Sequence, residues 1–333
     1  MKIWLIQKGF EALQRGEMRV FIKMLGVLIL IGTSAVVEVA CYYTWRVQRV
    51  FAHSKTIVIN GSKMLTLSGD RGISRELAVF GVREKFVTKY VQKTVGKNFN
   101  CIDIGANLGY YTLLEARRAR EGTIYAFEPD RGNFLVLQSN VLMNNAVNVV
   151  LSDRAVARER GAKDFYLYPK RNWSSFNDRI GYRYFDRVRV EAVSLDCIYK
   201  NINRPLNLVR MDVEGYEAQI ISGAKKLLRE SEKLTLIIEI HPHLSPKKDL
   251  QTMLATLQKS GFFIEAIMLE PLPRFYRYLE YINSYRRSVG VLPYGRLRKK
   301  YCRYDFLEKM LFSRERGFNY YPHVVFGKSK DKK

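Results

Sequence analysis

Acidic residues and glycines follow short apolar segments in the middle of the sequence, where they could bind a ligand. The first such group is Asp103-Ile-Gly105-Ala-Asn107-Leu-Gly109, which leads directly into a helical pattern. Glycines let the backbone turn sharply and approach a ligand, and the first turn of a helix offers free N–H groups. The spacing of these glycines differs from the GxGxxG fingerprint of dinucleotide-binding proteins, which disfavours a nicotinamide cofactor.

Another acidic residue, Glu128, follows the next apolar segment. A carboxylate at the tip of the second strand of a parallel sheet can accept hydrogen bonds from both hydroxyls of a ribose. Asp103, beside the glycine loop, favours a cationic ligand and repels a pyrophosphate. S-adenosylmethionine is an adenosine ligand that carries positive charge, so the two carboxylates together indicate this cofactor. The alternative is that both residues serve only in helix capping and turns.

The elements that would position these residues alternate between short apolar segments and amphipathic helical patterns. The predicted strands are residues 100–104, 123–127, 148–151, 206–211, 234–240 and 262–267, and predicted helices begin at Tyr110, Arg131, Tyr216 and Lys247. This alternation predicts an α/β fold with a parallel sheet that helices cover on both faces. Ligands of such sheets bind at the carboxyl ends of the strands. Before this pattern, Asn60-Gly61 predicts a β-hairpin.

Several motifs occur in one order along the chain. They are Asp103-Ile-Gly-Ala-Asn-Leu-Gly-Tyr-Tyr-Thr112, Ala126-Phe-Glu-Pro129, Ser194-Leu-Asp196 and Leu208-Val-Arg-Met-Asp-Val-Glu-Gly-Tyr-Glu217. With them, residues 55 to 327 resemble the FkbM family of S-adenosylmethionine-dependent methyltransferases. The resemblance implies a class I methyltransferase (Rossmann-like) fold with a seven-stranded sheet, whose last strand, here His323 to Phe326, inserts antiparallel. It also implies O-methylation of hydroxyls on sugars and other natural products.

The resemblance assigns cofactor contacts to particular residues. Asp103, Gly105, Asn107 and Gly109 would form the loop under the methionine part, and Glu128 would hold the ribose. Asp153, after the third strand, is the candidate for the adenine edge, with Ser152 and Arg154 as alternatives.

The resemblance also suggests contacts with the substrate. Trp173, Ser174 and Ser175 occupy the place of the family's serine pair, between the third and fourth strands. Trp173 could stack on a sugar or cover the cofactor. The alternative is a surface loop with an incidental tryptophan.

A hydroxyl acceptor must lose its proton during methyl transfer, and a positioned base typically raises the rate about 10²- to 10⁴-fold. Asp212 and Glu214 follow the fourth predicted strand, and Glu239 and His241 lie at the end of the fifth. These four residues are the predicted catalytic group. Glu239 and His241 could act together as the general base, or could hold a divalent metal together with Asp212. His241 could also be a hydrogen-bonded histidine without a catalytic role.

The chain has a net charge of +24, which suits a nucleic-acid binder, a protein on an anionic membrane or a reader of acidic substrates. Residues 100–269 contain 24 Lys and Arg against 20 Asp and Glu, so the excess lies outside them. Arginines and tyrosines interleave over residues 271–321. They suit stacking on RNA bases, binding to anionic lipid, or a solvated basic face. An RNA-methylating enzyme or a nonenzymatic nucleic-acid or anionic-surface binding protein is the alternative function.

Residues 24–43 form an apolar run with one charge, Glu38. Its length suits a membrane-spanning or membrane-embedded helix, and the alternative is a helix packed on the domain.

We expect a basic tail and apolar helix over 1–50, a hairpin and helical lead-in over 51–99, and the methyltransferase domain over 100–330. We expect the protein to lie at a membrane, with its catalytic domain facing the cytoplasm. The expected acceptor is a hydroxyl-bearing small molecule or a glycan.

Overall fold

A computed structural model of the chain describes residues 54–67, 70, 72–168, 171–178, 183–271, 294–312 and 321–329, together with residues 22, 25, 29, 283 and 286. The apolar run of residues 24–43 lies outside this part, apart from Leu25 and Ile29. No helix within the described residues is long and apolar enough to cross a bilayer.

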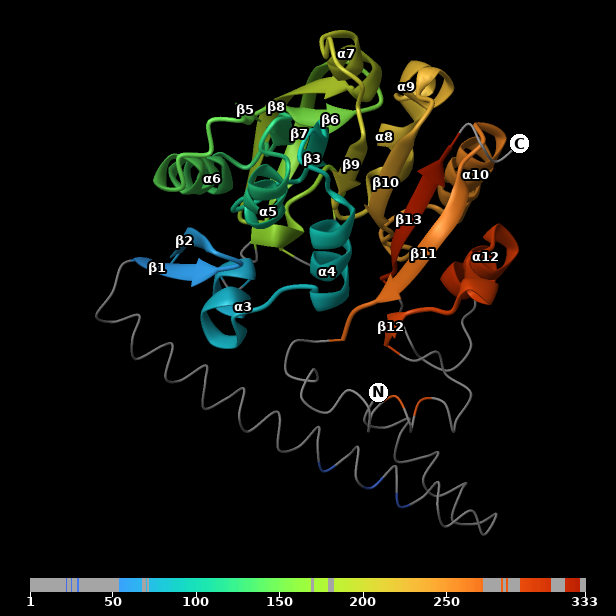
Figure 1. Cartoon of the computed structure of the whole chain (residues 1–333), viewed down its shortest axis with the longest axis horizontal. Coiled ribbons are helices and arrows are strands. Elements are labelled where there is room, and N and C mark those ends of the chain that lie inside the picture. The colour runs from blue at the N-terminus through green and yellow to red at the C-terminus, as the bar shows by residue number, and fades with distance from the viewer. Residues whose placement is uncertain are drawn as a thin grey trace.

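The central sheet has the strand order β12-β11-β13-β10-β9-β3-β4-β5 (Figure 1). Its strands are β3 (Cys101–Ile104), β4 (Ile124–Phe127), β5 (Val149–Ser152), β9 (Leu208–Met211), β10 (Leu234–Glu239), β11 (Phe263–Leu269), β12 (Gly295–Arg296) and β13 (His323–Lys328). Strands β10, β9, β3, β4 and β5 are parallel neighbours, whereas β13 inserts antiparallel between β10 and β11. The predicted class I methyltransferase fold is therefore confirmed.

The described part of the chain contributes eight strands to this sheet, where seven were predicted. The additional strand, β12, has two residues, which pair with Met268 and Leu269 at the edge of the sheet. It comes from the region of 271–321, whose sequence pattern did not indicate a strand.

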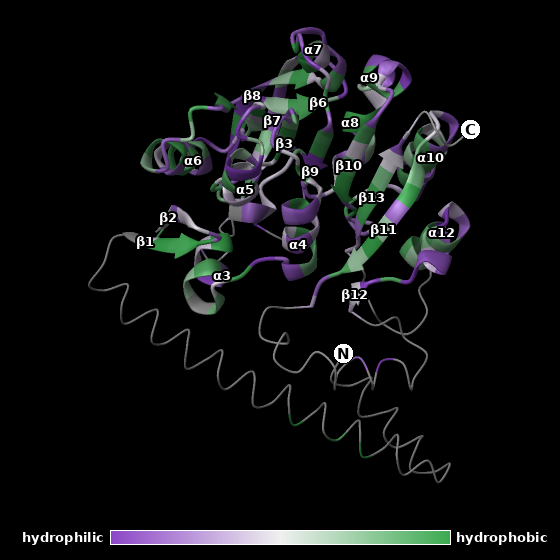
Figure 2. Cartoon of the chain, in the orientation of Figure 1, coloured by the Kyte–Doolittle hydropathy of each residue, from purple (hydrophilic) through white to green (hydrophobic). Residues whose placement is uncertain are grey.

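Helices cover the sheet on both faces, as predicted. One core contains side chains of α3 (Ile73–Phe80), α4 (Lys85–Thr94), α5 (Tyr110–Arg118) and α6 (Arg131–Met143), and the other those of α7 (Leu195–Lys200), α8 (Glu217–Ser222), α9 (Lys225–Glu230), α10 (Lys247–Lys259) and α12 (Tyr304–Phe312). Successive strand residues alternate between the two cores, with Leu236 and Ile238 in one and Ile237 in the other. Figure 2 shows hydrophobic strands in the centre and hydrophilic residues on the outer helices.

A separate sheet of three strands lies between β5 and β9 in the sequence. Its order is β6-β8-β7, with β6 (Ala155–Ala157), β7 (Gly161–Leu167) and β8 (Asp186–Ser194). The short helix η1 (Arg171–Trp173) lies between β7 and β8, and η3 (Lys299–Tyr301) precedes α12. The sequence pattern predicted no strand between residues 151 and 206, so this three-stranded sheet was not expected.

The predicted hairpin is confirmed as β1 (Ser54–Ile59) and β2 (Ser62–Leu67), which pair antiparallel around Asn60-Gly61. Asn140 of α6 connects the hairpin to the glycine loop after β3 through hydrogen bonds. This side chain is fully buried, and it accepts a hydrogen bond from the Leu65 N–H at 2.6 Å and donates one to the Leu108 carbonyl at 2.7 Å.

We predict that Asn140→Ala lowers the free energy of unfolding by about 3 kcal/mol, because it leaves two backbone groups unpaired at about 1–3 kcal/mol each. Urea unfolding measures this loss. Ser139→Ala is the matched control, because the Ser139 hydroxyl donates only to Leu135 of the same helix, and its effect should stay within about 0.5 kcal/mol. Equal stabilities of the two variants would contradict the role of Asn140.

Candidate active site

A cleft lies at the carboxyl ends of strands β3, β4 and β9. Its empty volume is about 610 Å³, part of it open to solvent. Gly105 and Asn107 line it from the loop after β3, Glu128 from the end of β4, and Asp212 and Glu214 from the loop after β9. Apolar and aromatic side chains line the remaining wall: Ile73, Ile104, Phe127, Pro129, Ala155, Val156, Phe165, Phe176, Val213 and Tyr216. The structure thus brings together five of the predicted cofactor-binding and catalytic residues.

The loop after β3 turns through residues with positive φ angles. The angle is 74° at Gly105, 51° at Asn107 and 89° at Gly109, values that glycine and asparagine adopt most readily. A Cβ atom at Gly105 would lie 2.1 Å from the carbonyl oxygen of Asp212. Glycine at this position therefore lets the loop approach the end of β9, and the two line one cleft.

Glu128 is buried, and its carboxylate is fixed to the glycine loop. It accepts hydrogen bonds from the backbone N–H groups of Asn107 at 2.8 Å and Asp130 at 2.9 Å. Burial, helped by the nearby Asp130, raises the pKa of Glu128 to about 8. Glu128 lies at the end of β4, which is the position from which it was predicted to bind the ribose.

Asp103, which was predicted to lie under the methionine part of the cofactor, is not among the described residues that line the cleft. Its side chain is fully buried, where it accepts a hydrogen bond from the Thr112 hydroxyl at 2.6 Å and pairs with Arg210 at 3.1 Å. The correction has a simple cause, because β3 and β9 place Asp103 and Arg210 in register and the two charges neutralise each other.

Asp153 also lies elsewhere than predicted. Its side chain is 62% exposed and forms an ion pair with Arg131 at 4.0 Å. After β5 the chain turns into β6, so that Ala155 and Val156 rather than Asp153 line the cleft. The structure gives no support for a contact between Asp153 and an adenine ring.

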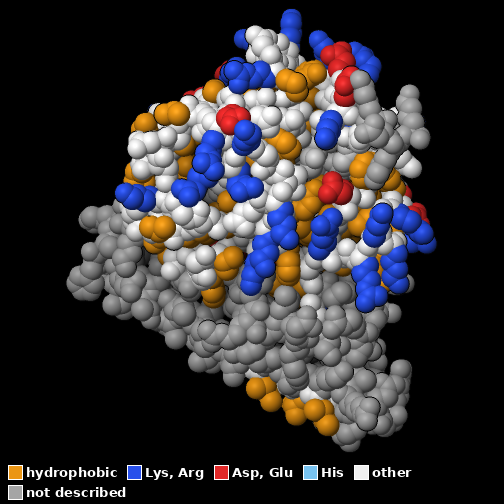
Figure 3. Space-filling view, in the orientation of Figure 1, with side chains coloured by type: hydrophobic (Ala, Val, Ile, Leu, Met, Phe, Trp, Pro, Cys, Tyr) orange, Lys and Arg blue, Asp and Glu red, His pale blue; other side chains and the backbone are white. Residues whose placement is uncertain are grey.

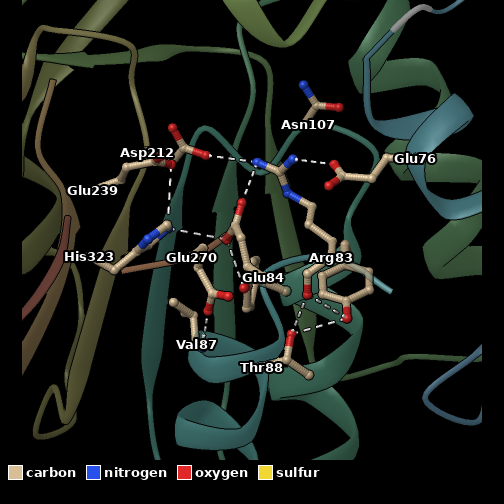
Figure 4. A network of polar contacts seen from close by, with 12 residues as sticks. Glu76, Arg83, Glu84, Val87, Thr88, Asn107, Asp212, Glu239, Glu270 and His323 are labelled. Atoms are coloured by element: carbon tan, nitrogen blue, oxygen red, sulfur yellow. Dashed lines mark hydrogen bonds and ion pairs between the residues drawn. The ribbon is translucent and has the colours of Figure 1, made fainter. Parts of the chain in front are cut away.

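Asp212 belongs to a network of ion pairs, in which Figure 4 shows its contact with Arg83. Its Oδ2 atom is 3.4 Å from Nη2 of Arg83 and 3.3 Å from Nη2 of Arg210. Burial and the negative charge of Glu239 nevertheless raise the pKa of Asp212 to about 7. A carboxylate that titrates near neutral pH is suited to accept a proton from a substrate.

His241 is surrounded by carboxylates. Its Nδ1 atom lies 2.7 Å from Glu217, and its Nε2 atom lies 3.5 Å from Glu214 and 3.8 Å from Glu239. Burial lowers the pKa of His241, but these carboxylates raise it well above its usual value. A protonated imidazole cannot accept a further proton, so this geometry disfavours His241 as the base.

Glu239 connects this histidine to a second one, His323. Its carboxylate is 3.4 Å from Nε2 of His323, which also lies 3.2 Å from Glu84. Burial alone would raise the pKa of Glu239, but the positive charges of His323 and His241 lower it to about 2. Glu239 therefore stays ionised and serves as a partner of two cations rather than as the base.

Two groups of three side chains could surround a cation. They are the predicted set of Asp212, Glu239 and His241, and a second set of Glu84, Glu239 and His323. Within each set the candidate ligand atoms lie within 4.8 Å of one another. Because metal ligands must be deprotonated, a metal ion would have to displace a proton from the histidine of either set. The predicted metal site stays a hypothesis.

The three predicted substrate residues lie in different surroundings, and one of them lines the cleft. Ser174 lines the cleft, together with Asn172 of the same loop. Ser175 is 2% exposed, and its hydroxyl bonds within the loop to Asn177. Trp173 is absent from the described cleft lining. Of the predicted three, only Ser174 is placed to meet a substrate.

Comparison with known proteins identifies the domain around this cleft. Residues 103–264 match the family model described as the methyltransferase FkbM domain. These residues form a methyltransferase FkbM domain. A protein named Methyltransferase 1 from Beauveria bassiana (strain ARSEF 2860) is 26% identical over 184 residues, which make up 49% of this chain and 72% of that protein.

Solved structures show weaker likeness. TYW2 of M. jannaschii in complex with AdoMet has 10% identity and a TM-score of 0.39, covering 83% of this chain and 85% of that one. An rRNA methylase of Streptococcus thermophilus has 8% identity and a TM-score of 0.38, covering 73% and 93%. At this level of similarity these structures say nothing about the acceptor.

The cleft of the FkbM domain fits its cofactor, S-adenosylmethionine. Glu128 would hold the ribose, and the backbone around Gly105 and Asn107 would lie along the methionine part. The described lining contains three acidic side chains, those of Glu128, Asp212 and Glu214, and no lysine or arginine. A lining without lysine or arginine suits a ligand whose reactive centre is a positively charged sulfur.

Sequence analysis missed Arg83, Arg210 and His323, which balance the carboxylates of the FkbM domain. A signal was present for Arg210, because it is the one charged residue of the apolar strand β9, just as Asp103 is the one charged residue of β3. Two opposite charges at the same place in neighbouring strands favour a buried pair. For Arg83 and His323 no comparable pattern exists.

We predict that the affinity for S-adenosylmethionine rises with pH through about 8, the pKa of Glu128. Below this pH the side chain is a neutral acid, and above it the carboxylate accepts hydroxyl hydrogen bonds more strongly. Glu128→Gln should weaken binding about tenfold to hundredfold, by ~1.5–3 kcal/mol, as for a hydrogen bond to a charged group.

Calorimetric titration of both proteins across this pH range checks the prediction. The amino group of the ligand titrates equally in both experiments, so the difference between the two profiles isolates Glu128. Parallel profiles would show that Glu128 does not titrate at the cofactor.

Proposed function

We propose that this methyltransferase transfers a methyl group to a hydroxyl of a sugar, glycan or lipid-linked small molecule. The observation that carries the proposal is Asp212, a carboxylate that lines the cleft and has a pKa near 7. A base of this kind is what a hydroxyl acceptor requires. The segment after β9, Asp212-Val-Glu-Gly215, lacks the Asn-Pro-Pro-Tyr sequence that would suggest methylation of a nitrogen.

When bound, S-adenosylmethionine supplies a methyl group on a positively charged sulfur. The residues of the chain then have two tasks, which are alignment and proton removal. Asp212 accepts the hydroxyl proton as the oxygen–carbon bond forms and the carbon–sulfur bond breaks. Positioning by the loops around Gly105 and Glu214 supplies alignment, which in favourable cases lowers a barrier by roughly 7–11 kcal/mol.

The charge of the cleft favours an uncharged acceptor over RNA. The described lining contains no lysine or arginine, and Arg83 and Arg210 behind Asp212 are each paired with acids, so the lining offers no free positive charge that would attract a phosphate. Lysine and arginine side chains are instead spread over the face of the domain that Figure 3 shows. RNA methylation is therefore the second candidate, which the following experiment decides.

The full chain is incubated with labelled S-adenosylmethionine and, separately, with extracted lipids, glycans or RNA. We expect the label in the lipid or glycan fraction. Asp212→Asn should reduce this transfer about 10²- to 10⁴-fold, the usual contribution of a positioned base. Cofactor affinity should be retained, since Asp212 contacts the acceptor.

Asp164→Asn is the matched control, because Asp164 lies on β7 and, within the described residues, forms ion pairs with the exposed Arg187 and Arg189. Its transfer rate should equal that of the wild type. Label in RNA alone would overturn the proposed acceptor class, and full activity of Asp212→Asn would remove this residue from the mechanism.

We also propose that the enzyme works at an anionic membrane with its catalytic domain on the cytoplasmic side. The support is the apolar run of residues 24–43 and the basic residues around it. Leu25 and Ile29 are helical, with 48% and 57% of their surface exposed. Each basic residue near such a surface contributes about 1 kcal/mol to binding.

Flotation with phosphatidylserine-containing vesicles tests this location. The wild type should float with these vesicles and less with neutral ones, and the double variant Leu25→Asp, Ile29→Asp should lose most of the binding. Val147→Asp is the control, because Val147 is 96% exposed on the loop after α6 and lies outside the apolar run. Unchanged flotation of the double variant would contradict an insertion of this helix.

A further inference from the structure

Arg83 reaches the candidate base from a segment that precedes the FkbM domain. It lies between helices α3 and α4, outside the residues 103–264 that match the family model. Its side chain is only 11% exposed and lies against the end of β9. A charged group brought into the interior from outside the domain requires an explanation, since burial of a charge is costly unless it is paired.

The contacts of Arg83 point in two directions (Figure 4). Nη1 lies 3.0 Å from Glu76 of helix α3, while Nη2 lies 2.6 Å from Glu84 and 3.4 Å from Oδ2 of Asp212. The planar guanidinium thus joins the lead-in to the candidate base, a geometry that a lysine cannot reproduce.

The backbone around Arg83 is fixed as well. Its carbonyl oxygen accepts a hydrogen bond from the Thr88 hydroxyl at 3.0 Å. The first turn of helix α4 is held by Glu270, whose carboxylate accepts hydrogen bonds from the N–H groups of Phe86 at 2.7 Å and Val87 at 2.9 Å. Arg83 is therefore presented by a rigid turn rather than by a free loop.

Both arginines hold the same oxygen of Asp212. Arg83 and Arg210 contact Oδ2, and Oδ1 makes no hydrogen bond or ion pair within the described part of the chain. A carboxylate held at one oxygen by two guanidinium groups has a defined orientation. The other oxygen is then the one available to an acceptor in the cleft.

We propose that Arg83 is a positioning residue for methyl transfer: it fixes Oδ2 of Asp212 from the side of the lead-in, so that Oδ1 faces the acceptor hydroxyl. This role rests on the proposed function of Asp212 as the base. It makes the lead-in a part of the active site, although its sequence lies before the FkbM domain.

Removal of the guanidinium also changes the charge around Asp212. The charged and titratable groups near it come from the lead-in, from β9 and its loop, and from the ends of β10 and β13: Arg83, Glu84, Arg210, Glu214, Glu239, His241 and His323. Without Arg83 one positive neighbour is lost, and Glu84 loses its partner at 2.6 Å. Both changes disfavour the ionised form of Asp212.

The test compares the full-length wild type with Arg83→Met and Arg83→Lys. In Arg83→Met, we expect kcat at neutral pH to fall about tenfold to hundredfold, as for a misplaced catalytic group. The rising limb of the pH profile should move upward by about one unit or more. The affinity for S-adenosylmethionine should not change. Arg83→Lys keeps the charge, so its rising limb should stay near that of the wild type while its kcat is reduced.

Arg117→Met is the matched control, since Arg117 donates to the Gly61 carbonyl on the surface and is remote from the cleft. It should leave kcat and the pH profile unchanged. A folded Arg83→Met variant with the wild-type kcat and pH profile would overturn the proposal. If this variant does not fold, Arg83→Lys tests the proposal instead. A kcat of Arg83→Lys equal to that of the wild type would show that the guanidinium contacts are not needed.

A second measurement separates this proposal from the proposed function. Carbon NMR of labelled aspartate follows the titration of Asp212 without any acceptor, and Asp212→Asn assigns the signal. We expect the Asp212 titration to move upward in Arg83→Met, and an unmoved titration would overturn the contact itself. If the wild type transfers no label to any fraction, the proposed function fails, while this titration still reports whether Arg83 holds Asp212.

Discussion

The carboxylate of Asp212 is held between two guanidinium groups, and the arrangement of the cleft depends on this contact. Arg210 reaches it from within the sheet and also neutralises Asp103 on the neighbouring strand. Arg83 reaches it from the lead-in. A buried carboxylate is costly unless it is paired and hydrogen-bonded. The lead-in, strand β3 and the end of β9 are therefore joined by one network of charges.

The residues that sequence analysis placed correctly share one property, which is their position at strand ends. Gly105, Glu128, Asp212 and Glu214 each follow a short apolar strand of the parallel sheet. The carboxyl ends of such strands meet at one edge, so the strand pattern is enough to bring these residues to one cleft. The class of fold was predictable for the same reason.

The misplaced residues show what a strand pattern leaves open. Asp103 lies within β3, where the direction of the side chain and the register with Arg210 decide its role. His241 was predicted as a base from its residue type, but its protonation depends on Glu214, Glu217 and Glu239 together. These neighbours come from β10 and from the loop and helix after β9, so only the packed structure brings their charges together.

The separation of charge between surface and cleft resolves an apparent conflict in the composition. A net charge of +24 would oppose the binding of a cofactor with a positively charged sulfur if it extended into the site. The described cleft lining has carboxylates and no lysine or arginine, and the arginines behind Asp212 are each paired with acids. The excess of positive charge therefore lies outside the described cleft lining and does not oppose cofactor binding there. The net charge of the chain therefore does not describe the charge at the cleft, and it says little about the acceptor.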